Sequence, residues 1–279
     1  MEKICVAAIS MCSGSDRPQN LLAASHLIAE ACDQGADWIQ LPEVFSYYGP
    51  AKELYENSVS LESSFVEGLG ELALKHKVVL FAGSIPERSS ESKKKVFNTS
   101  LVFDRNGKRI GLYRKVHLFR LAADEKYTRE SYDESKSYLA GTKTQALNID
   151  GWRVGLSICY DLRFGEHYLK TSEVFGDVDI FTAPSAFTAF TGAAHWHLLL
   201  KARAVERQAY FFAANQCGEH RPKRQSYGHA LVVDPWGEVL ADSGPESGIA
   251  IAVCDKKQLT LTRSRLPALN DRVHRFSVT

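Results

Sequence analysis

The 279-residue sequence has almost no net charge and no long apolar run. Lys plus Arg total 34 against 33 for Asp plus Glu, so the chain has no overall field that would attract nucleic acid or an anionic membrane. No segment approaches about 18 consecutive apolar residues, so we expect no membrane-spanning helix. The apolar run Ile4 to Cys12 is short and lacks a cleavage pattern, and we therefore expect no signal peptide.

Close cysteine pairs and metal-ligand spacings are also missing. The six cysteines, at positions 5, 12, 32, 159, 217 and 254, form no CxxC motif. Four of them lie in or at the end of apolar runs, so we expect free thiols and a cytoplasmic location. His195 and His197, two residues apart on a predicted helix, do not share one face. We therefore expect no metal and no cofactor, and a small molecule as the partner.

The apolar pattern divides the chain into two similar halves. Residues 4–115 read as strand, helix, strand, helix and three strands, and residues 152–254 repeat this order. Asn106-Gly107 and Asp150-Gly151 each predict a hairpin turn. We therefore expect one α/β domain over residues 1–279, a four-layer αββα sandwich of two mixed sheets with helices outside. A doubly wound single sheet is the alternative, but the Gly-rich phosphate loop common in such folds is absent.

Cys159 is the candidate nucleophile. The apolar run Val154–Ile158 predicts a buried strand that ends at Cys159, and a polar turn then leads into a helix from about Glu166. Unpaired backbone N–H groups at such a turn would stabilise a thiolate or a developing oxyanion. The alternative is a small buried residue, which is the usual role of a free cysteine.

Two charged residues also follow predicted strands. Glu43 comes after Trp38–Leu41, and Lys115 comes after Arg109–Tyr113. Strand ends are where α/β proteins collect functional groups. Taken singly, the ordinary explanation is favoured for each: Glu43 as a solvated loop acid and Lys115 as a strand-end charge. The polar segment 116–143 is too long for an ordinary connection, which favours a functional loop.

Three segments resemble, in the same order, the signature segments of the nitrilase superfamily of carbon–nitrogen hydrolases. They are Leu41–Phe45, Tyr113–Phe119 and Ile158–Phe164. The similarity extends from about Ile4 to Arg265. The resemblance implies the αββα sandwich, a catalytic triad of Glu43, Lys115 and Cys159, and a homodimer.

The resemblance also implies a reaction. The Cys159 thiolate would attack an amide carbonyl, with Glu43 taking the thiol proton and returning it to the leaving amine. Lys115 and the Tyr160 N–H would stabilise the oxyanion. Water activated by Glu43 would then hydrolyse the thioester.

The superfamily pattern includes a second glutamate. Glu134, seven residues before Gly141, resembles that segment, and Glu130 is a competing match. We prefer Glu134 because its spacing to the glycine fits, and we expect it to hold Lys115 and orient the substrate. The alternative is an exposed loop carboxylate.

Later segments resemble the Nit branch, which contains ω-amidases and deaminated glutathione amidases. These segments are Pro184–Thr188, Thr191–Trp196, Gln216–Gly218 and Ser226–His229, of which the last two look closer to the deaminated glutathione amidases. We therefore expect deaminated glutathione, or a related ω-amide of an α-keto acid, as substrate. An ω-amidase is the nearest alternative, a nitrilase is a more distant one, and a non-enzymatic interaction protein is the rival from another class.

Arg163 is the candidate partner for a substrate carboxylate. It follows the nucleophile by four residues, so its guanidinium could reach over the pocket and bind a carboxylate bidentately. By resemblance, Phe187 would line the same end through its ring and backbone, and Thr191 through its hydroxyl. Alternatively, Arg163 pairs with Asp161 or Glu166.

Two positions depart from the family pattern. Gly165 stands where proline is usual, which we expect to loosen the helix start behind the nucleophile. His197 stands where a glutamate usually follows the tryptophan, which leaves the polar network around it undefined.

Overall fold

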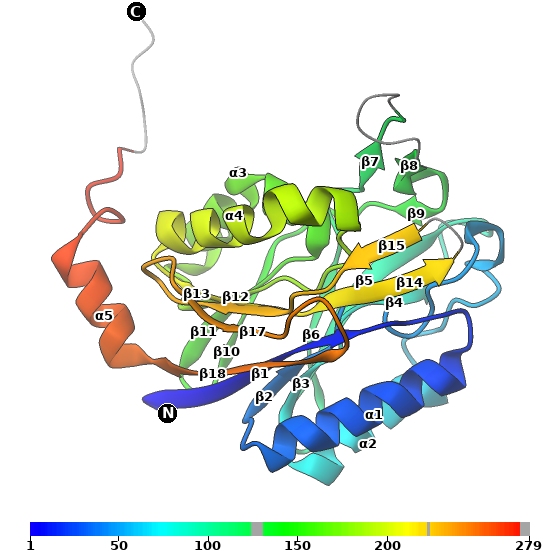
Figure 1. The fold of residues 1–279 in the computed structure, drawn as a ribbon, viewed down its shortest axis with the longest axis horizontal. Coiled ribbons are helices and arrows are strands. Elements are labelled where there is room, and N and C mark those ends of the chain that lie inside the picture. Colours follow the sequence, from blue (N-terminus) through cyan, green and yellow to red (C-terminus); the bar gives the residue numbers. More distant parts are fainter. Residues whose placement is uncertain (124–130, 222–223, 274–279) are drawn as a thin grey trace, which may run out of the picture.

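The protein is a stack of four layers. The computed structural model describes residues 1–123, 131–221 and 224–273, and within these ranges it contains a ten-stranded and a six-stranded sheet that face each other. Helices α1 (Arg17–Asp33) and α2 (Ser64–His76) cover the outer face of the first sheet, whereas α3 (Gly165–Phe175) and α4 (Ala189–Arg207) cover that of the second (Figure 1). The predicted αββα sandwich is confirmed.

The ten-stranded sheet is built mainly from the first half of the chain. Its strands are β1 (Lys3–Met11), β2 (Trp38–Gln40), β3 (Val79–Phe81), β4 (Ile85–Arg88), β5 (Val96–Phe103), β6 (Arg109–Arg114), β9 (Tyr138–Leu139), β14 (Asn215–Arg221), β15 (Arg224–Tyr227) and β18 (Gly248–Asp255). The main order is β15-β14-β1-β2-β3-β5-β4, while β18 pairs with β1, and β6 and β9 pair with β5.

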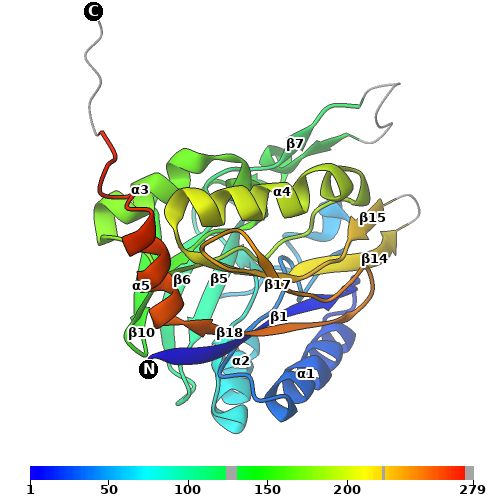
Figure 2. The same ribbon diagram turned by 60° about the vertical axis from the view of Figure 1, so that its left-hand side comes forward.

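The six-stranded sheet comes from the second half. Its order is β10 (Gln145–Ile149), β11 (Trp152–Leu156), β12 (Ile180–Thr182), β13 (Tyr210–Ala213), β16 (Leu231–Val233) and β17 (Val239–Asp242). Outside both sheets, β7 (Arg120–Leu121) pairs with β8 (Tyr132–Asp133). The short helices are η1 (Ala51–Glu53), η2 (Glu134–Lys136) and η3 (Cys159–Arg163). Helix α5 (Lys256–Arg265) follows β18 along one side of the sandwich (Figure 2).

Alternation along the strands separates two hydrophobic cores. In β1, Val6 and Ala8 point into the space between the sheets, while Ala7 and Ile9 pack toward α1 and α2. Between the sheets, the rings of Phe81 and Phe212 meet edge to face at 5.1 Å. The two sheets are therefore fixed against each other by large apolar side chains.

The chain passes from one sheet to the other between β13 and β14. Asn215 and Gln216 pair with Ser10 and Met11 at the end of β1. The buried Gln216 side chain also donates to the Glu43 carbonyl oxygen at 2.9 Å. This crossing therefore supports the loop that carries Glu43.

Several element boundaries differ from the predicted ones. The apolar run Val78–Ile85 predicts one strand, but the chain there forms β3 and β4 with a break at Gly83, where φ is 50° and a side chain would collide with the Pro42 carbonyl oxygen. The sequence predicts a helix over Ala194–Arg207, and α4 begins five residues earlier, at Ala189. Strand β15 and helix α5 were not predicted. None of the helices in the described ranges combines the length and apolar character needed to cross a membrane.

Candidate active site

Cys159 lies at a constrained turn between β11 and η3. Its backbone φ is +46°, a left-handed value that is uncommon for a residue with a side chain. Its N–H donates to the Pro184 carbonyl oxygen at 3.0 Å, and the Ile158 N–H donates to Asp161 Oδ2 at 2.9 Å. The surrounding hydrogen bonds thus hold the unusual conformation, as is common at active sites.

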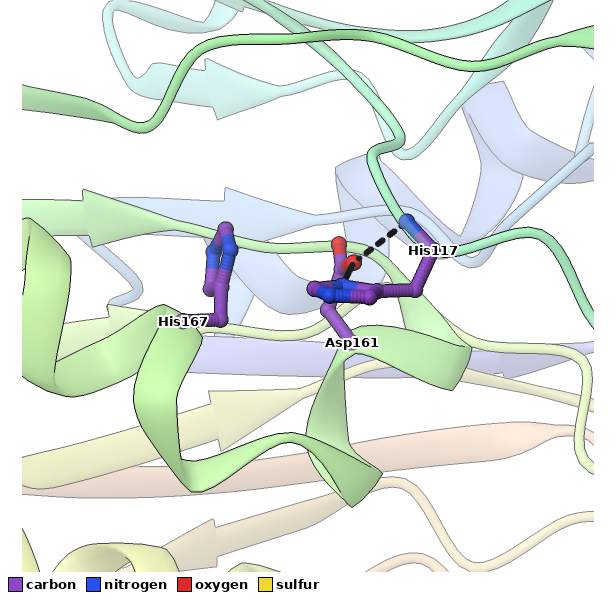
Figure 3. Close-up of side chains that lie close together, drawn as sticks. All are labelled: His117, Asp161 and His167. Carbon is purple, nitrogen blue, oxygen red and sulfur yellow. Dashed lines mark hydrogen bonds and ion pairs between the residues drawn. The ribbon is translucent and has the colours of Figure 1, made fainter.

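Asp161 is a connecting residue that the sequence analysis did not single out. It is fully buried and accepts hydrogen bonds from the Tyr113 hydroxyl at 2.7 Å and from the His117 N–H at 3.1 Å. His117 Nδ1 lies 2.7 Å from the same carboxylate (Figure 3). Because Tyr113 and His117 flank Lys115 in sequence, Asp161 ties the Cys159 turn to the segment that carries Lys115.

These contacts keep Asp161 ionised. Burial alone would raise the pKa of Asp161, but the hydrogen bond from His117, the neighbouring His167 and the hydrogen bond from Tyr113 outweigh it and hold this pKa below its usual range. Burial in turn lowers the pKa of His167, whose Nε2 lies 3.2 Å from the Leu156 carbonyl oxygen. The cluster is therefore a structural anchor with a buried carboxylate at its centre.

Lys115 is buried between two carboxylates. Its Nζ lies 2.7 Å from Glu43 Oε1 and 2.9 Å from Glu134 Oε2, and its side chain is fully inaccessible to solvent. The Asn98 side chain also donates to Glu43 Oε1, at 2.8 Å. The Phe119 N–H donates to Glu134 Oε2 at 2.7 Å. Glu43 and Glu134 are thus both fixed by hydrogen bonds besides those from the lysine.

Electrostatics favour a charged lysine at this position. Burial alone would lower the pKa of Lys115, but the carboxylates of Glu134 and Glu43 reverse the effect and raise this pKa well above its usual value. Burial raises the pKa of Glu134, and the charge of Lys115 opposes that rise. The group held between Glu43 and Glu134 is therefore a positively charged Lys115.

Cys159 rests as a neutral thiol. Burial and the nearby negative charge of Glu43 raise its pKa well above 9.0, although Lys115 and a hydrogen bond from the Ala186 backbone act in the opposite direction. Burial and Glu43 thus favour the neutral thiol before a substrate binds, and stabilisation of a thiolate or a developing oxyanion at this turn stays a prediction. Reactivity has to come from transfer of the thiol proton as the sulfur attacks.

A cavity of about 490 Å³ connects these groups. Cys159, Glu43 and Glu134 line it together, while Lys115 lies behind its wall. The remaining lining residues are Val44, Tyr47, Tyr48, Gly49, Ala51, Leu54, Phe119, Ser131, Tyr132, Asp133, Ser137, Tyr138, Tyr160, Arg163, Ala186, Phe187, Thr188, Thr191 and Arg224. The cavity is large enough for a metabolite-sized substrate.

All four predicted substrate-binding residues line this cavity. The Arg163 guanidinium lies over the Phe187 ring at 5.5 Å and over the Tyr160 ring at 5.8 Å. The Phe187 N–H donates to Asn215 Oδ1, and its carbonyl oxygen accepts from the Tyr227 N–H. The ring of Phe187 and the second lone pair of its carbonyl oxygen therefore remain for a substrate.

The sequence leaves alternatives open at two positions: the partner of Arg163, and the choice between Glu134 and Glu130 as the second glutamate. Among the described residues, Arg163 forms no ion pair with Asp161 or Glu166, and its Nη1 lies 3.4 Å from His195 Nδ1. Glu134 begins η2 and contacts Lys115 as expected. The competing Glu130 lies outside the described residues.

The expectation that no His, Cys and Asp side chains cluster is wrong. His117, Asp161 and His167 form one group with metal-ligand spacing, and His197, His229 and Asp242 form another. Sequence spacing could not show this, because their members come from separate elements. In the first group, Figure 3 shows the His117 ring against the Asp161 carboxylate, whose oxygens already accept hydrogen bonds. A metal ion there would have to displace those bonds, so this group fits a metal poorly.

The second group shows which polar residues surround His197, the residue that stands where the family usually has a glutamate. Asp242 Oδ2 lies 3.1 Å from His197 Nε2, and Asp242 Oδ1 lies 2.9 Å from His229 Nδ1. A carboxylate is therefore present between these rings, but it comes from β17 rather than from position 197. These three residues do not line the cavity.

Gly165 does not prevent the helix behind the nucleophile from starting. Helix α3 begins at Gly165, close to the predicted start at Glu166, but no side chain caps its first turn. A carbon attached at Gly165 would lie 3.3 Å from the tip of the Arg203 side chain. The position thus accepts a Cβ atom if the tip of Arg203 shifts by a few tenths of an ångström.

Comparison with known proteins places this geometry in a family. The model of the carbon-nitrogen hydrolase family matches residues 5–264. The chain belongs to the carbon-nitrogen hydrolase family. This carbon-nitrogen hydrolase is 37% identical to the deaminated glutathione amidase of Synechocystis, over 98% of its own length and 99% of that protein. It is 34% identical to the omega-amidase NIT2 of Homo sapiens, over 96% of its own length and 94% of that protein.

A solved structure gives the same result for the fold. Nit3 of Saccharomyces cerevisiae, a member of branch 10 of the nitrilase superfamily, superposes with a TM-score of 0.84 at 31% identity, covering 95% of each chain. The predicted membership of the nitrilase superfamily is confirmed, and this carbon-nitrogen hydrolase is an amide-hydrolysing enzyme.

Proposed function

We propose that this carbon-nitrogen hydrolase cleaves deaminated glutathione, or a related ω-amide of an α-keto acid, through a thioester on Cys159. The observation that supports this most directly is the shared cavity. Cys159 and Glu43 both line it, and Lys115 lies behind its wall with Nζ 2.7 Å from Glu43 Oε1. Together these groups supply a nucleophile, a proton acceptor and a cation that can stabilise an oxyanion, which suits acyl transfer from an amide.

In the first half-reaction, Glu43 accepts the Cys159 proton as the sulfur attacks the amide carbonyl carbon. The Lys115 ammonium and the Tyr160 N–H stabilise the oxyanion that forms. When the oxyanion collapses, the C–N bond breaks and Glu43 returns its proton to the leaving nitrogen. The acyl group remains on Cys159 as a thioester.

In the second half-reaction, water replaces the amine. Glu43 accepts a proton from the water while the oxygen attacks the thioester carbon. The C–S bond breaks, the acid leaves, and Glu43 returns the proton to sulfur. Glu134 keeps Lys115 in position through both steps, because it holds the same Nζ as Glu43.

Arg163 supports an acidic acyl group. Its guanidinium faces the cavity from the turn of the nucleophile and lies over the Phe187 ring, and Thr191 lines the same cavity. A guanidinium is suited to bind an α-keto carboxylate through two parallel hydrogen bonds. Simple ω-amides also satisfy this contact, so an ω-amidase is the second candidate.

The experiment is a panel of amides and one nitrile, assayed for release of ammonia or amine. Deaminated glutathione, an α-keto acid ω-amide, a matched amide without the carboxylate and the corresponding nitrile should be compared. We expect the two keto acid amides to be cleaved best and Cys159→Ala to abolish turnover. Glu43→Gln should lose about 10²–10⁴-fold in kcat. Turnover of none of these compounds, or retention of activity by Cys159→Ala, would contradict the proposal and favour a non-enzymatic role or another nucleophile.

We also propose a homodimer located in the cytoplasm. Leu198 and Val205, seven residues apart on α4, are 64% and 47% exposed, and Trp236 is 56% exposed. Helical residues with this spacing share a face, so α4 offers an apolar surface to a second copy. Sedimentation of the wild type should give a dimer, and Leu198→Asp should shift it toward monomer. All six cysteines are free, which supports a reducing compartment.

A further inference from the structure

A second arginine faces the cavity, and it has no role in the reaction steps described above. Arg224 begins β15 and lines the same cavity as Cys159. Its guanidinium lies over the Tyr48 ring at 4.4 Å and over the Tyr132 ring at 4.9 Å. The two rings hold the guanidinium in place without neutralising its charge.

Arg224 has unused hydrogen-bonding capacity. Its Nε is buried and has no hydrogen-bond partner among the described residues, and the ion pairs found in those parts of the chain do not include Arg224. Glu134 is the nearest candidate for a counter-ion, but its two oxygens are committed to Lys115 and to the Phe119 N–H. A guanidinium left in this state is costly unless a ligand supplies the acceptor.

Arg224 and Arg163 occupy different places on the cavity wall. Arg163 contacts Tyr160, Phe187 and His195, whereas the cation–π contacts of Arg224 within the described residues are with Tyr48 and Tyr132. Arg163 follows the nucleophile directly in the chain, whereas Arg224 comes from the edge of the ten-stranded sheet. One cavity therefore presents two guanidinium groups with separate surroundings.

We infer that Arg224 binds a carboxylate on the amine that leaves, while Arg163 binds the carboxylate of the acyl group. This inference rests on the proposed function and narrows it. A substrate that loses ammonia has nothing to offer Arg224. Deaminated glutathione has a keto acid on the acyl side of the scissile amide and a glycine carboxylate on the amine side, which matches two separated cations. The substrate class is thus a keto acid amide whose amine part ends in a carboxylate.

The test compares two substrates that differ in one group. Deaminated glutathione and its C-terminal carboxamide share the acyl part and the scissile bond, and only the first has a carboxylate on the amine. A charge-assisted contact contributes about 1.5–3 kcal/mol, or roughly 10–150-fold. In the wild type, kcat/KM should favour the free acid by about this factor, mainly through KM. Arg224→Gln should remove this preference. Arg163→Lys should lower kcat/KM for both substrates by the same factor, so that the ratio of the two kcat/KM values stays unchanged.

Product inhibition gives a second measurement that needs no variant. Cysteinylglycine should inhibit the wild type at least about tenfold better than cysteinylglycinamide. If the wild type cleaves both substrates equally and both products inhibit alike, the role assigned to Arg224 is wrong even though the amidase remains. If the wild type cleaves neither substrate, the proposed function itself fails. Should Arg224→Gln not fold, Arg224→Lys keeps the charge, loses bidentate binding, and should reduce the ratio partly.

Discussion

The Tyr113 hydroxyl donates to Asp161 Oδ2 at 2.7 Å, and this bond joins the strand before Lys115 to the turn that carries Cys159. The nucleophile and the lysine follow strands of different sheets, Cys159 after β11 and Lys115 after β6. Their relative position therefore depends on contacts between those two segments. Asp161 supplies them, because it also accepts from the Ile158 and His117 N–H groups.

Replacing Asp161 should damage both stability and turnover. Asparagine keeps the shape but puts an NH₂ group against donors, so Asp161→Asn should lower the free energy of unfolding by about 1.5–3 kcal/mol. The reaction should slow through kcat more than through KM, because Asp161 does not line the cavity. Tyr113→Phe removes one of the bonds and should cost about 1 kcal/mol. Equal kcat in Asp161→Asn and wild type would show that the link is not needed for alignment.

The contribution of Asp161 should also depend on pH. Its folded pKa is lower than in the unfolded chain, so the unfolded state binds the proton more readily. The stabilisation is then complete above the ordinary pKa of 3.8 and is lost as the pH falls through the folded value. The stability difference between wild type and Asp161→Asn, measured by denaturant unfolding, should be constant near neutral pH and shrink below about pH 4. A difference that does not change with acid would contradict the assigned ionisation.

The pKa of the Cys159 thiol should set the pH at which activity declines on the alkaline side. The active form keeps one proton shared between Cys159 and Glu43, and loss of the thiol proton would leave none for the leaving amine. Because burial and Glu43 raise the thiol pKa well above 9.0, kcat/KM should show no decline up to pH 9. Initial rates at low substrate concentration over pH 7–10 measure this. A fall with an apparent pKa near 8.5 would indicate an unperturbed thiol.

The sequence could predict the residues that follow strands but not those that converge from distant segments. Glu43 and Cys159 directly follow short apolar runs, so topology places them at the same end of the sandwich. Asn98 contacts Glu43 from β5, and Ala186 contacts Cys159 from the loop between β12 and α4; no local pattern indicates such contacts. Arg224 resembles any polar strand residue until folding places it over two tyrosine rings.

The errors in the fold also have local causes. Helix α5 buries only Leu259 and Thr262, so its sequence has no apolar periodicity to detect. The break at Gly83 results from the close approach of the Pro42 carbonyl, which is a tertiary contact. Glu134 could be preferred over Glu130 because of its spacing to Gly141, whose N–H donates to the Lys115 carbonyl oxygen at 2.8 Å.

Removing the buried lysine should destabilise the fold, and removing one of its carboxylates as well should restore part of the lost stability. Lys115→Met leaves Glu43 and Glu134 buried without their cation, which should destabilise the fold by about 3–5 kcal/mol. Adding Glu134→Gln removes one uncompensated carboxylate and should restore part of the loss. Both variants should be inactive because the oxyanion partner is gone. A double variant no more stable than Lys115→Met would show that the carboxylates tolerate the missing charge.

Turnover should be independent of metal. The buried group around Asp161 is already satisfied by hydrogen bonds, and His197, His229 and Asp242 do not line the cavity. Dialysis against a strong chelator should therefore leave kcat unchanged. His229→Gln, a control outside the cavity, should respond to the chelator as the wild type does. Loss of activity that zinc restores would overturn the proposed steps.

Gly165 offers a way to stabilise the protein without touching the cavity. It is the first residue of α3, where the N–H needs no helical partner and proline is favoured. The preceding Phe164 has φ −113° and ψ 92°, an extended conformation that tolerates a following proline.

Gly165→Pro should therefore raise the free energy of unfolding by about 0.4–1 kcal/mol, chiefly because the unfolded chain loses freedom. The Arg203 tip, 3.3 Å from the added carbon, has to move slightly, and it is the end of a flexible side chain. Thermal unfolding should show a rise in Tm of about 1–3 °C. Gly165→Ala is the matched control, since it adds the same first carbon without the ring and should give a smaller rise than proline. A lower Tm for both variants would show that Arg203, which donates from Nε to the Leu162 carbonyl oxygen at 3.0 Å, cannot yield, and that this position has to be glycine in this chain.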